Sequence, residues 1–166
     1  MANKIFPEYI TLPDRSSKMP AHEQVELGKK IMDRMDDILD EDTIVKIRHK
    51  HTCNLTKNQV KEIEDLKEEV ESIEELCKKY SRPLTPGYVK KDDDVLTVSF
   101  GWGRCVCNMY RKLDEYEPVS KTWCECCNGH VIKIYNRLLE RPVSSEMIET
   151  VASGGDDCIF EIRYER

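Results

Sequence analysis

The sequence lacks long hydrophobic runs and an excess of basic residues. Of its 166 residues 39% are hydrophobic, and no segment approaches the roughly 20 consecutive apolar residues that a transmembrane helix needs. The first residues, Met1 to Pro7, also lack the apolar stretch of a secretory signal peptide. The net charge is −6, whereas phosphate backbones and anionic membranes attract clustered Lys and Arg. We therefore predict a cytoplasmic protein that binds neither nucleic acid nor membrane.

The motifs of several large enzyme classes are missing as well. The sequence contains no phosphate-binding loop, no dinucleotide-binding glycine motif and no sign of a Ser-His-Asp triad. It also has no internal repeat and no low-complexity segment. Its length fits a single domain over residues 1–166 that buries its own core, with a helical half at 1–82 and a cysteine-rich half at 88–166.

The pattern of the first half predicts helices. Apolar residues recur at three- and four-residue spacing between positions 21 and 39, which predicts one amphipathic helix. Asp42 is expected to cap a second helix, and Thr56 begins a capping box for a third. The third helix either continues to Tyr80 or is divided near Ser72, where a second capping box fits the sequence.

The second half changes to the alternating pattern of strands. Residues 88–100 hold two short alternating segments around three aspartates, which predicts a hairpin. Asn128 is expected to be the N-cap of a helix that ends before Pro142. Residues 143–151 and 158–164 predict a second hairpin. The expected fold class is α+β, with N-terminal helices packed on an antiparallel sheet of two hairpins and one helix between the hairpins.

Six of the eight cysteines lie between positions 105 and 158, and their spacing indicates a metal site. Cys105 with Cys107, and Cys124 with Cys126, are C-x-C pairs, and an extended C-x-C segment points both sulfurs to one side. Two such pairs provide the four thiolates that zinc prefers, and Cys158 is a further candidate ligand. Two alternatives remain open, namely thiol redox or nucleophilic chemistry and buried, inert cysteines.

A candidate catalytic pair follows these cysteines. Cys127 directly precedes the expected cap Asn128, where a helix N-terminus would stabilise a thiolate and make this sulfur the most reactive one. His130 is a candidate acid-base partner or ligand in the same helix. The alternatives are a half-buried cysteine packed behind the helix and a surface histidine.

A second group of candidate residues suggests a ligand pocket. If the second helix persists, His49 and Cys53 are spaced i, i+4 and either chelate a metal or line a pocket. Alternatively, His49 and His51 end that helix, whose C-terminal dipole favours positive charge. Trp102 and Trp123 flank the cysteine pairs and either wall the pocket or pack against the core.

The C-terminal half resembles a known superfamily. The resemblance is carried by Cys124 five residues before Gly129, an amphipathic helix, the Arg141-Pro142-Val143 entry to a strand, and Gly154-Gly155-Asp156-Asp157-Cys158-Ile159-Phe160. These features, covering roughly 88–166, are similar to the end of the vinyl-reductase-type (4VR) small-molecule-binding domain, which is related in fold to haem-NO-binding and Golgi-tethering domains. The ending also resembles L-2-amino-thiazoline-4-carboxylic acid hydrolase-like proteins, and the whole chain looks like a bacterial or archaeal family of unknown function.

The resemblance implies an α+β ligand-binding fold in which a cysteine-bound zinc shapes the pocket. Cys124 and Cys158 match the pattern of that zinc site. Two further ligands of the family fall near Met147 and Thr150, neither of which is a strong metal ligand. Either the metal is absent, or other residues replace these ligands. The candidate replacements are Cys105, Cys107, Cys126 and, more weakly, Glu149.

The resulting prediction is a protein that binds a small-molecule ligand beside a cysteine-rich zinc site. One alternative is a hydrolase of a small amide or thiazoline-like substrate, acting through a metal-bound water or through Cys127. Another alternative is a thiol-based redox sensor. The prediction also allows for a homodimer.

Overall fold

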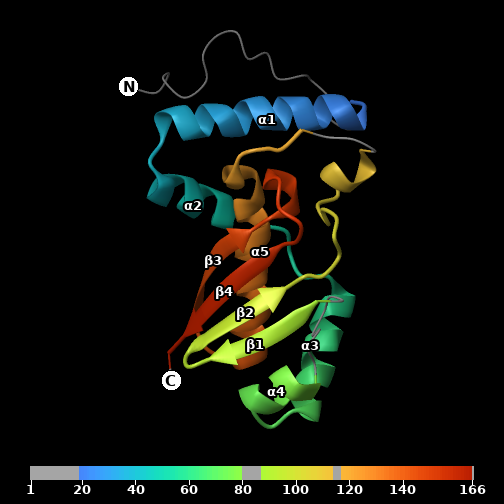
Figure 1. The fold of residues 1–166 in the computed structure, drawn as a ribbon, viewed down its shortest axis with the longest axis vertical. Coiled ribbons are helices and arrows are strands. Elements are labelled where there is room, and N and C mark those ends of the chain that lie inside the picture. Colours follow the sequence, from blue (N-terminus) through green and yellow to red (C-terminus); the bar gives the residue numbers. More distant parts are fainter. Residues whose placement is uncertain (1–18, 80–86, 114–116, 166) are drawn as a thin grey trace.

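The protein is an α+β fold, as the sequence predicts. The computed structural model describes residues 19–79, 87–113 and 117–165 (Figure 1). Residues 1–18 and Tyr80, on which two of the sequence predictions fall, lie outside this range. The helices of the described part are α1 (Ala21–Ile38), α2 (Glu41–Lys50), α3 (Lys57–Glu69), α4 (Ile73–Lys79) and α5 (Lys121–Leu139), with 3-10 turns η2 (Tyr110–Lys112) and η3 (Val151–Ser153). The strands are β1 (Tyr88–Asp92), β2 (Val95–Ser99), β3 (Val143–Glu149) and β4 (Ile159–Tyr164).

The four strands form one antiparallel sheet in the order β1-β2-β4-β3. Both predicted hairpins are confirmed, and they join where β2 pairs with β4. Alternate residues of β4, from Phe160 to Tyr164, are buried, as the predicted alternation requires. A bulge between Met147 and Glu149 ends the regular pairing of β3, and the chain then turns through η3 instead of continuing as a strand to Val151.

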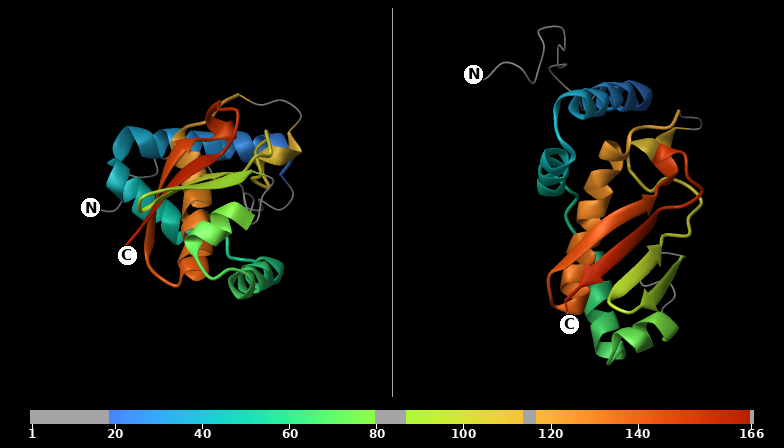
Figure 2. Two further views of the ribbon diagram at one scale, coloured as in Figure 1. Left: turned by 60° about the horizontal axis from the view of Figure 1, so that its bottom comes forward. Right: turned by 60° about the vertical axis from the view of Figure 1, so that its left-hand side comes forward.

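Helix α5 is the central helix and lies along the sheet, with α2 beside it and α1 across its first turns (Figures 1 and 2). Two glycines allow these close approaches. A Cβ atom on Gly28 of α1 would lie 2.7 Å from a ring carbon of the buried Trp123. A Cβ atom on Gly129 would lie 3.1 Å from the Cα of His49 in α2. Glycine at both positions lets α1 and α2 pack directly on α5.

The start of α5 corrects the sequence prediction. The helix begins at Lys121, and the Ser120 hydroxyl caps it by accepting a 3.0 Å hydrogen bond from the Thr122 amide. Asn128 is therefore an interior helical residue, and the prediction of Asn128 as N-cap is wrong. The cysteine-rich stretch between them contains no glycine or proline that would interrupt a helix, so the earlier cap sets the start.

The other helix signals are mostly confirmed. Helix α1 matches the predicted 21–39 segment, and Thr56 and Gln59 form the expected reciprocal capping box. The cap of α2 is Asp40, which accepts a hydrogen bond from the backbone of α2, so the choice of Asp42 is wrong by two residues. The third helical segment is divided at Ser72, whose hydroxyl accepts a hydrogen bond from the first turn of α4. No helix within the described ranges is both long and apolar enough to cross a bilayer.

Candidate functional site

The structure gathers the six C-terminal cysteines around the first half of α5. Three lie on α5 itself, two lie on the segment between β2 and η2, and one immediately precedes β4. Burial raises the pKa of Cys105 to about 12 and that of Cys158 to about 11, with added repulsion from neighbouring thiols. All eight cysteines are free thiols. The buried members of this group are therefore protonated near neutral pH.

The helical conformation of Cys124 and Cys126 separates their side chains. Residues two apart on an α-helix point about 200° apart around its axis, whereas the sequence argument assumed an extended C-x-C. Cys124 packs inward, 4.0 Å from the Ser153 hydroxyl. Within residues 19–79, 87–113 and 117–165, no three Cys, His, Asp or Glu side chains are arranged to hold one metal ion. The conformation of these two cysteines does not fit the expected tetrathiolate site, and zinc binding stays a prediction.

Elemental analysis of freshly purified, reduced protein decides the zinc prediction. If the cysteines bind zinc, the protein should carry about one zinc per chain, and Cys124→Ser or Cys158→Ser should release it because thiolates dominate the affinity. Cys77→Ser is the control, because Cys77 lies on α4, outside the cysteine group. Metal-free wild-type protein would refute the prediction.

The Gly-Gly-Asp-Asp turn has a structural role in this fold. The Glu149 carboxylate accepts hydrogen bonds from the Asp156 amide at 2.5 Å and the Asp157 amide at 3.1 Å. The Asp157 carboxylate in turn accepts hydrogen bonds from the Ser99 hydroxyl and, at 2.9 Å, from the Gly101 amide. These contacts join the end of β2 to the start of β4, so Glu149 holds this turn, and its role as a replacement metal ligand stays a prediction.

Cys126, and not Cys127, has the environment of a reactive thiol. A hydrogen bond from the Cys127 thiol and the nearby charge of Arg48 lower the pKa of Cys126 to about 6. Arg48 of α2 is held against α5, because its guanidinium group donates hydrogen bonds to the Thr122 and Trp123 carbonyls at 3.1 and 3.0 Å. The bond to Cys126 and burial raise the pKa of Cys127 well above its usual value. Helix α5 begins after its N-cap Ser120, and Cys127 lies inside the helix. The prediction that a helix N-terminus lowers the pKa of Cys127 is therefore wrong.

The histidines mainly connect α5 to the N-terminal helices. The Cys53 carbonyl can only accept, so His130 donates to it from Nδ1 at 3.0 Å and accepts from the Gln59 amide at Nε2, at 3.1 Å. Helix α2 ends at Lys50 with His51 as C-cap, so Cys53 lies beyond the helix and its predicted i, i+4 pairing with His49 is wrong. The alternative, that His49 and His51 end this helix, is confirmed, because His49 lies in the basic last turn of α2 and His51 is its C-cap.

The two tryptophans differ in their surroundings. Trp123 is 5% exposed and packs edge-on against Tyr110, with ring centroids 5.3 Å apart. Trp102 is 45% exposed. Trp123 therefore packs against the core, which is one of the two alternatives that the sequence left open. Neither tryptophan lines the pocket described next.

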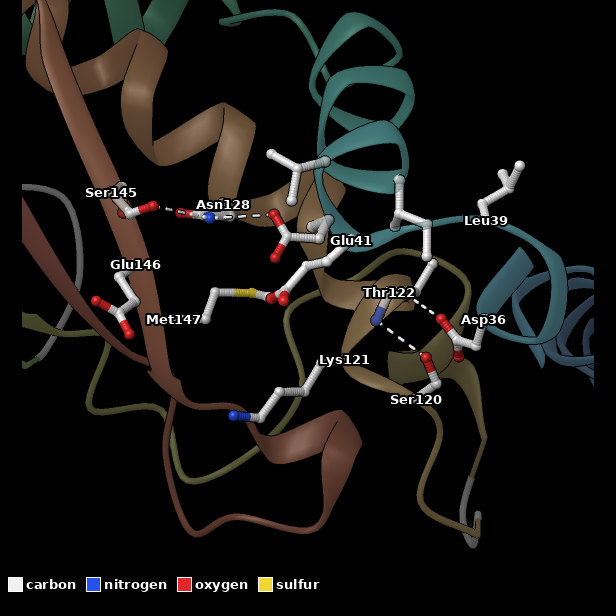
Figure 3. Close-up of a pocket in the computed structure, with 13 residues that line it drawn as sticks. Asp36, Leu39, Glu41, Ser120, Lys121, Thr122, Asn128, Ser145, Glu146 and Met147 are labelled. Carbon is white, nitrogen blue, oxygen red and sulfur yellow. Dashed lines mark hydrogen bonds between the residues drawn. The ribbon is translucent and has the colours of Figure 1, made fainter. Parts of the chain in front are cut away.

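A pocket of about 500 Å³ lies between α1, α2, the first turns of α5 and β3 (Figure 3). We call it the α2–α5–β3 pocket. It is lined by Asp36, Leu39, Glu41, Ile44, Val45, Ser120, Lys121, Thr122, Glu125, Asn128, Ser145, Glu146 and Met147. The pocket residues predicted from sequence, His49, His51, Cys53, Trp102 and Trp123, are not among them. His49 is one contact removed, because its Nε2 atom lies 2.8 Å from the Glu125 carboxylate.

Asn128 is the most buried polar side chain of this pocket. It is 3% exposed, and its amide nitrogen donates to the Glu125 carboxylate at 3.1 Å and to the Ser145 carbonyl at 3.2 Å. Because both partners are acceptors, these contacts fix the orientation of the carboxamide. Its Oδ1 atom, like the Ser145 hydroxyl, is buried without a hydrogen-bond partner among the described residues. A buried, unpaired acceptor costs about 1–3 kcal/mol, which a bound donor would offset.

Comparison with known proteins places the chain in an uncharacterised family. The sequence profile described as "Family of unknown function (DUF6144)" matches residues 8–166. The chain belongs to this family. No curated protein matches this DUF6144 chain. The expected membership of a family of unknown function is thus confirmed, and its bacterial or archaeal origin stays a prediction.

Solved structures similar to this DUF6144 chain are distant. One is a trafficking protein particle complex subunit 3 from Naegleria fowleri covalently bound to palmitic acid, at 13% identity and a TM-score of 0.45, covering 88% of this chain and 95% of that one. Another is a vinyl-4-reductase family protein from Methanocaldococcus jannaschii, at 17% identity and a TM-score of 0.33, covering 92% and 85%. Kinship with the vinyl-reductase-type superfamily stays a prediction.

The residues of the pocket were missed by the sequence reasoning. Glu125 and Asn128 are spaced i, i+3 on a helix whose other buried residues are largely apolar, such as Val131 and Ile134. Two polar residues on such a face are the signal that would have identified them. With Asn128 as the predicted N-cap, Glu125 lies outside the predicted helix. The i, i+3 spacing of the two residues on one helical face is then not visible.

Proposed function

We propose that this DUF6144 protein binds a small molecule in the α2–α5–β3 pocket. The observation that carries the proposal is the Asn128 Oδ1 atom, an acceptor without a partner among the described residues at the wall of the pocket. The volume, about 500 Å³, falls within the roughly 300–1,000 Å³ of small-molecule sites. Apolar side chains of Leu39, Ile44 and Met147 stand beside the polar ones, a combination that such sites use for affinity and orientation.

A fragment screen by methyl and amide NMR tests this function. We expect hits that shift the resonances of Ile44, Val45 and Met147 together, because these residues line one pocket. Val45→Trp should fill the pocket and abolish the shifts. Ile47→Trp is the matched control, because Ile47 lies on the same helix, is exposed and does not line the pocket. A library without a hit at these residues, or hits unaffected by Val45→Trp, would contradict the proposal.

Thiol chemistry at Cys126 is a second candidate function. It is supported by the position of Arg48 of α2, whose two hydrogen bonds to backbone carbonyls of α5 hold its guanidinium group near this thiol. A cation beside a half-buried cysteine favours the thiolate, which is the nucleophilic and oxidisable form. This candidate replaces Cys127 with Cys126 as the residue of a redox sensor or nucleophile.

A further inference from the structure

We propose that the ligand of the α2–α5–β3 pocket carries a protonated amine, which Asn128 and Glu125 bind. This inference rests on the proposed function and adds the chemical class of the ligand. It depends on the hydrogen-bonding state of the buried wall, on the charges around the opening and on the apolar residues between them.

The buried wall holds two groups that are unpaired within the described part of the chain, the Asn128 Oδ1 atom, which only accepts, and the Ser145 hydroxyl, which can accept or donate. The Asn128 amide nitrogen is fully used by the Glu125 carboxylate and the Ser145 carbonyl, so only its Oδ1 atom is left to face a ligand. The contacts of Glu125 with His49 and Asn128 both use its Oε2 atom, and a carboxylate has a second oxygen that accepts. A ligand group that donates several hydrogen bonds therefore fits this wall, and an ammonium group has three donors.

The charges of the pocket favour a cation over a neutral donor or an anion. Four carboxylates line it, from Asp36, Glu41, Glu125 and Glu146, against the single ammonium of Lys121. Glu125 contacts the same Asn128 carboxamide at its amide nitrogen, and the Glu125 side chain is only 14% exposed. Charges at a partly buried site interact more strongly than in bulk water, so a ligand cation gains from this carboxylate and a ligand anion is repelled.

The rest of the pocket fits a short apolar body. Leu39, Ile44, Val45 and Met147 supply its hydrocarbon surface. Figure 3 shows Ser145, Glu146 and Met147 of β3 on one side, and Asp36, Thr122 and Ser120 on the other. The Thr122 hydroxyl already donates to the Asp36 carboxylate, so Asp36 is a weaker candidate for the amine contact than Glu125. A branched alkylamine matches this arrangement of a polar wall and an apolar lining.

The test compares three probes of one shape and different charge on the full-length protein. Isoamylammonium, the neutral 3-methylbutan-1-ol and the anionic 3-methylbutanoate are titrated at pH 7 and constant ionic strength, with the methyl resonances of Ile44, Val45 and Met147 as readout. We expect isoamylammonium to bind at least about tenfold more tightly than the alcohol and the carboxylate to bind most weakly, because a charge-assisted hydrogen bond is roughly twice as strong as a neutral one.

Two variants assign the preference to the proposed residues. Glu125→Gln keeps an acceptor for His49 and Asn128 and removes the charge, so the preference for the ammonium over the alcohol should fall at least about fivefold. Asn128→Leu should weaken binding of both probes, since it removes the acceptor, and Glu62→Gln on the exposed face of α3 should change neither. Equal or tighter binding of the alcohol or carboxylate overturns the amine inference and leaves the proposed function standing. If none of the three probes reaches the pocket, the amine inference is refuted, and the fragment screen decides the proposed function.

Discussion

A brief iodoacetamide pulse at pH 7 should modify Cys126 at least about ten times faster than Cys127. The pKa of Cys126 is lowered to about 6, so most of this thiol is ionised at pH 7, whereas Cys127 donates a hydrogen bond to the Cys126 sulfur and stays protonated. The thiolate is the species that reacts. Because the pKa is lowered, fast labelling is expected above about pH 6 and should be lost as the pH falls through that value. Fragment-ion mass spectrometry assigns the label to one of the two adjacent residues.

The cause of the reactivity is tested at Arg48. Arg48→Met removes the cation beside Cys126 and should slow its labelling several-fold at pH 7, while Arg163→Met, on the exposed side of β4, should leave the rate unchanged. Cys77 is an internal reference, because burial raises its pKa. If Cys126 is a zinc ligand, labelling should be slow until a chelator is added. Faster labelling of Cys127, or labelling of Cys126 as slow as that of Cys77 with and without chelator, would contradict the assignment.

The parts of the fold that the sequence predicts correctly depend on local patterns. Helix α1 follows from apolar spacing, α3 from the box of Thr56 and Gln59, and the buried face of β4 from strict alternation up to Tyr164. Each of these signals lies within one element and agrees with what the surrounding structure buries. The tertiary contacts therefore leave these elements as the local patterns predict them.

The start of α5 was misplaced because two N-cap signals compete over eight residues. Ser120 and Asn128 are both good caps, and the residues between them have no clear apolar period. Contacts from elsewhere in the chain stabilise the helix start at Ser120. Arg48 donates hydrogen bonds to carbonyls of the first α5 turn, and the Trp123 ring packs against Gly28. The cysteine spacing was then interpreted on an extended backbone, which led to the C-x-C zinc prediction.

The candidate pocket also follows from the tertiary structure and not from a motif. Its residues come from α1, α2, α5 and β3, and Asp36 lies far from Met147 in the sequence. What identifies the site is the unpaired acceptor of Asn128, and this property depends on the orientation that Glu125 and the Ser145 carbonyl impose. A single sequence carries no record of hydrogen bonds across such separations.

The second large effect is expected at Tyr110, which anchors the segment that carries Cys105 and Cys107. Its side chain is fully buried, packs edge-on against Trp123 and donates a 2.7 Å hydrogen bond to the Glu117 carbonyl. Tyr110→Ala should lower the free energy of unfolding by about 3–5 kcal/mol, the usual cost of truncating a buried aromatic residue. Urea denaturation followed by circular dichroism measures this change.

Tyr110→Phe separates packing from hydrogen bonding in the same position. It keeps the ring against Trp123 and loses the bond to the Glu117 carbonyl, so it should cost about 1 kcal/mol, a typical net hydrogen-bond contribution. Trp102→Ala is the control for an aromatic residue of the same segment, and because Trp102 is 45% exposed its truncation should stay within about 0.5 kcal/mol. If Tyr110→Ala were as mild as Trp102→Ala, the cysteine-bearing segment would lie outside the cooperative core. A large loss in Tyr110→Ala with a small one in Tyr110→Phe means instead that burial of this ring fixes Cys105 and Cys107 beside α5.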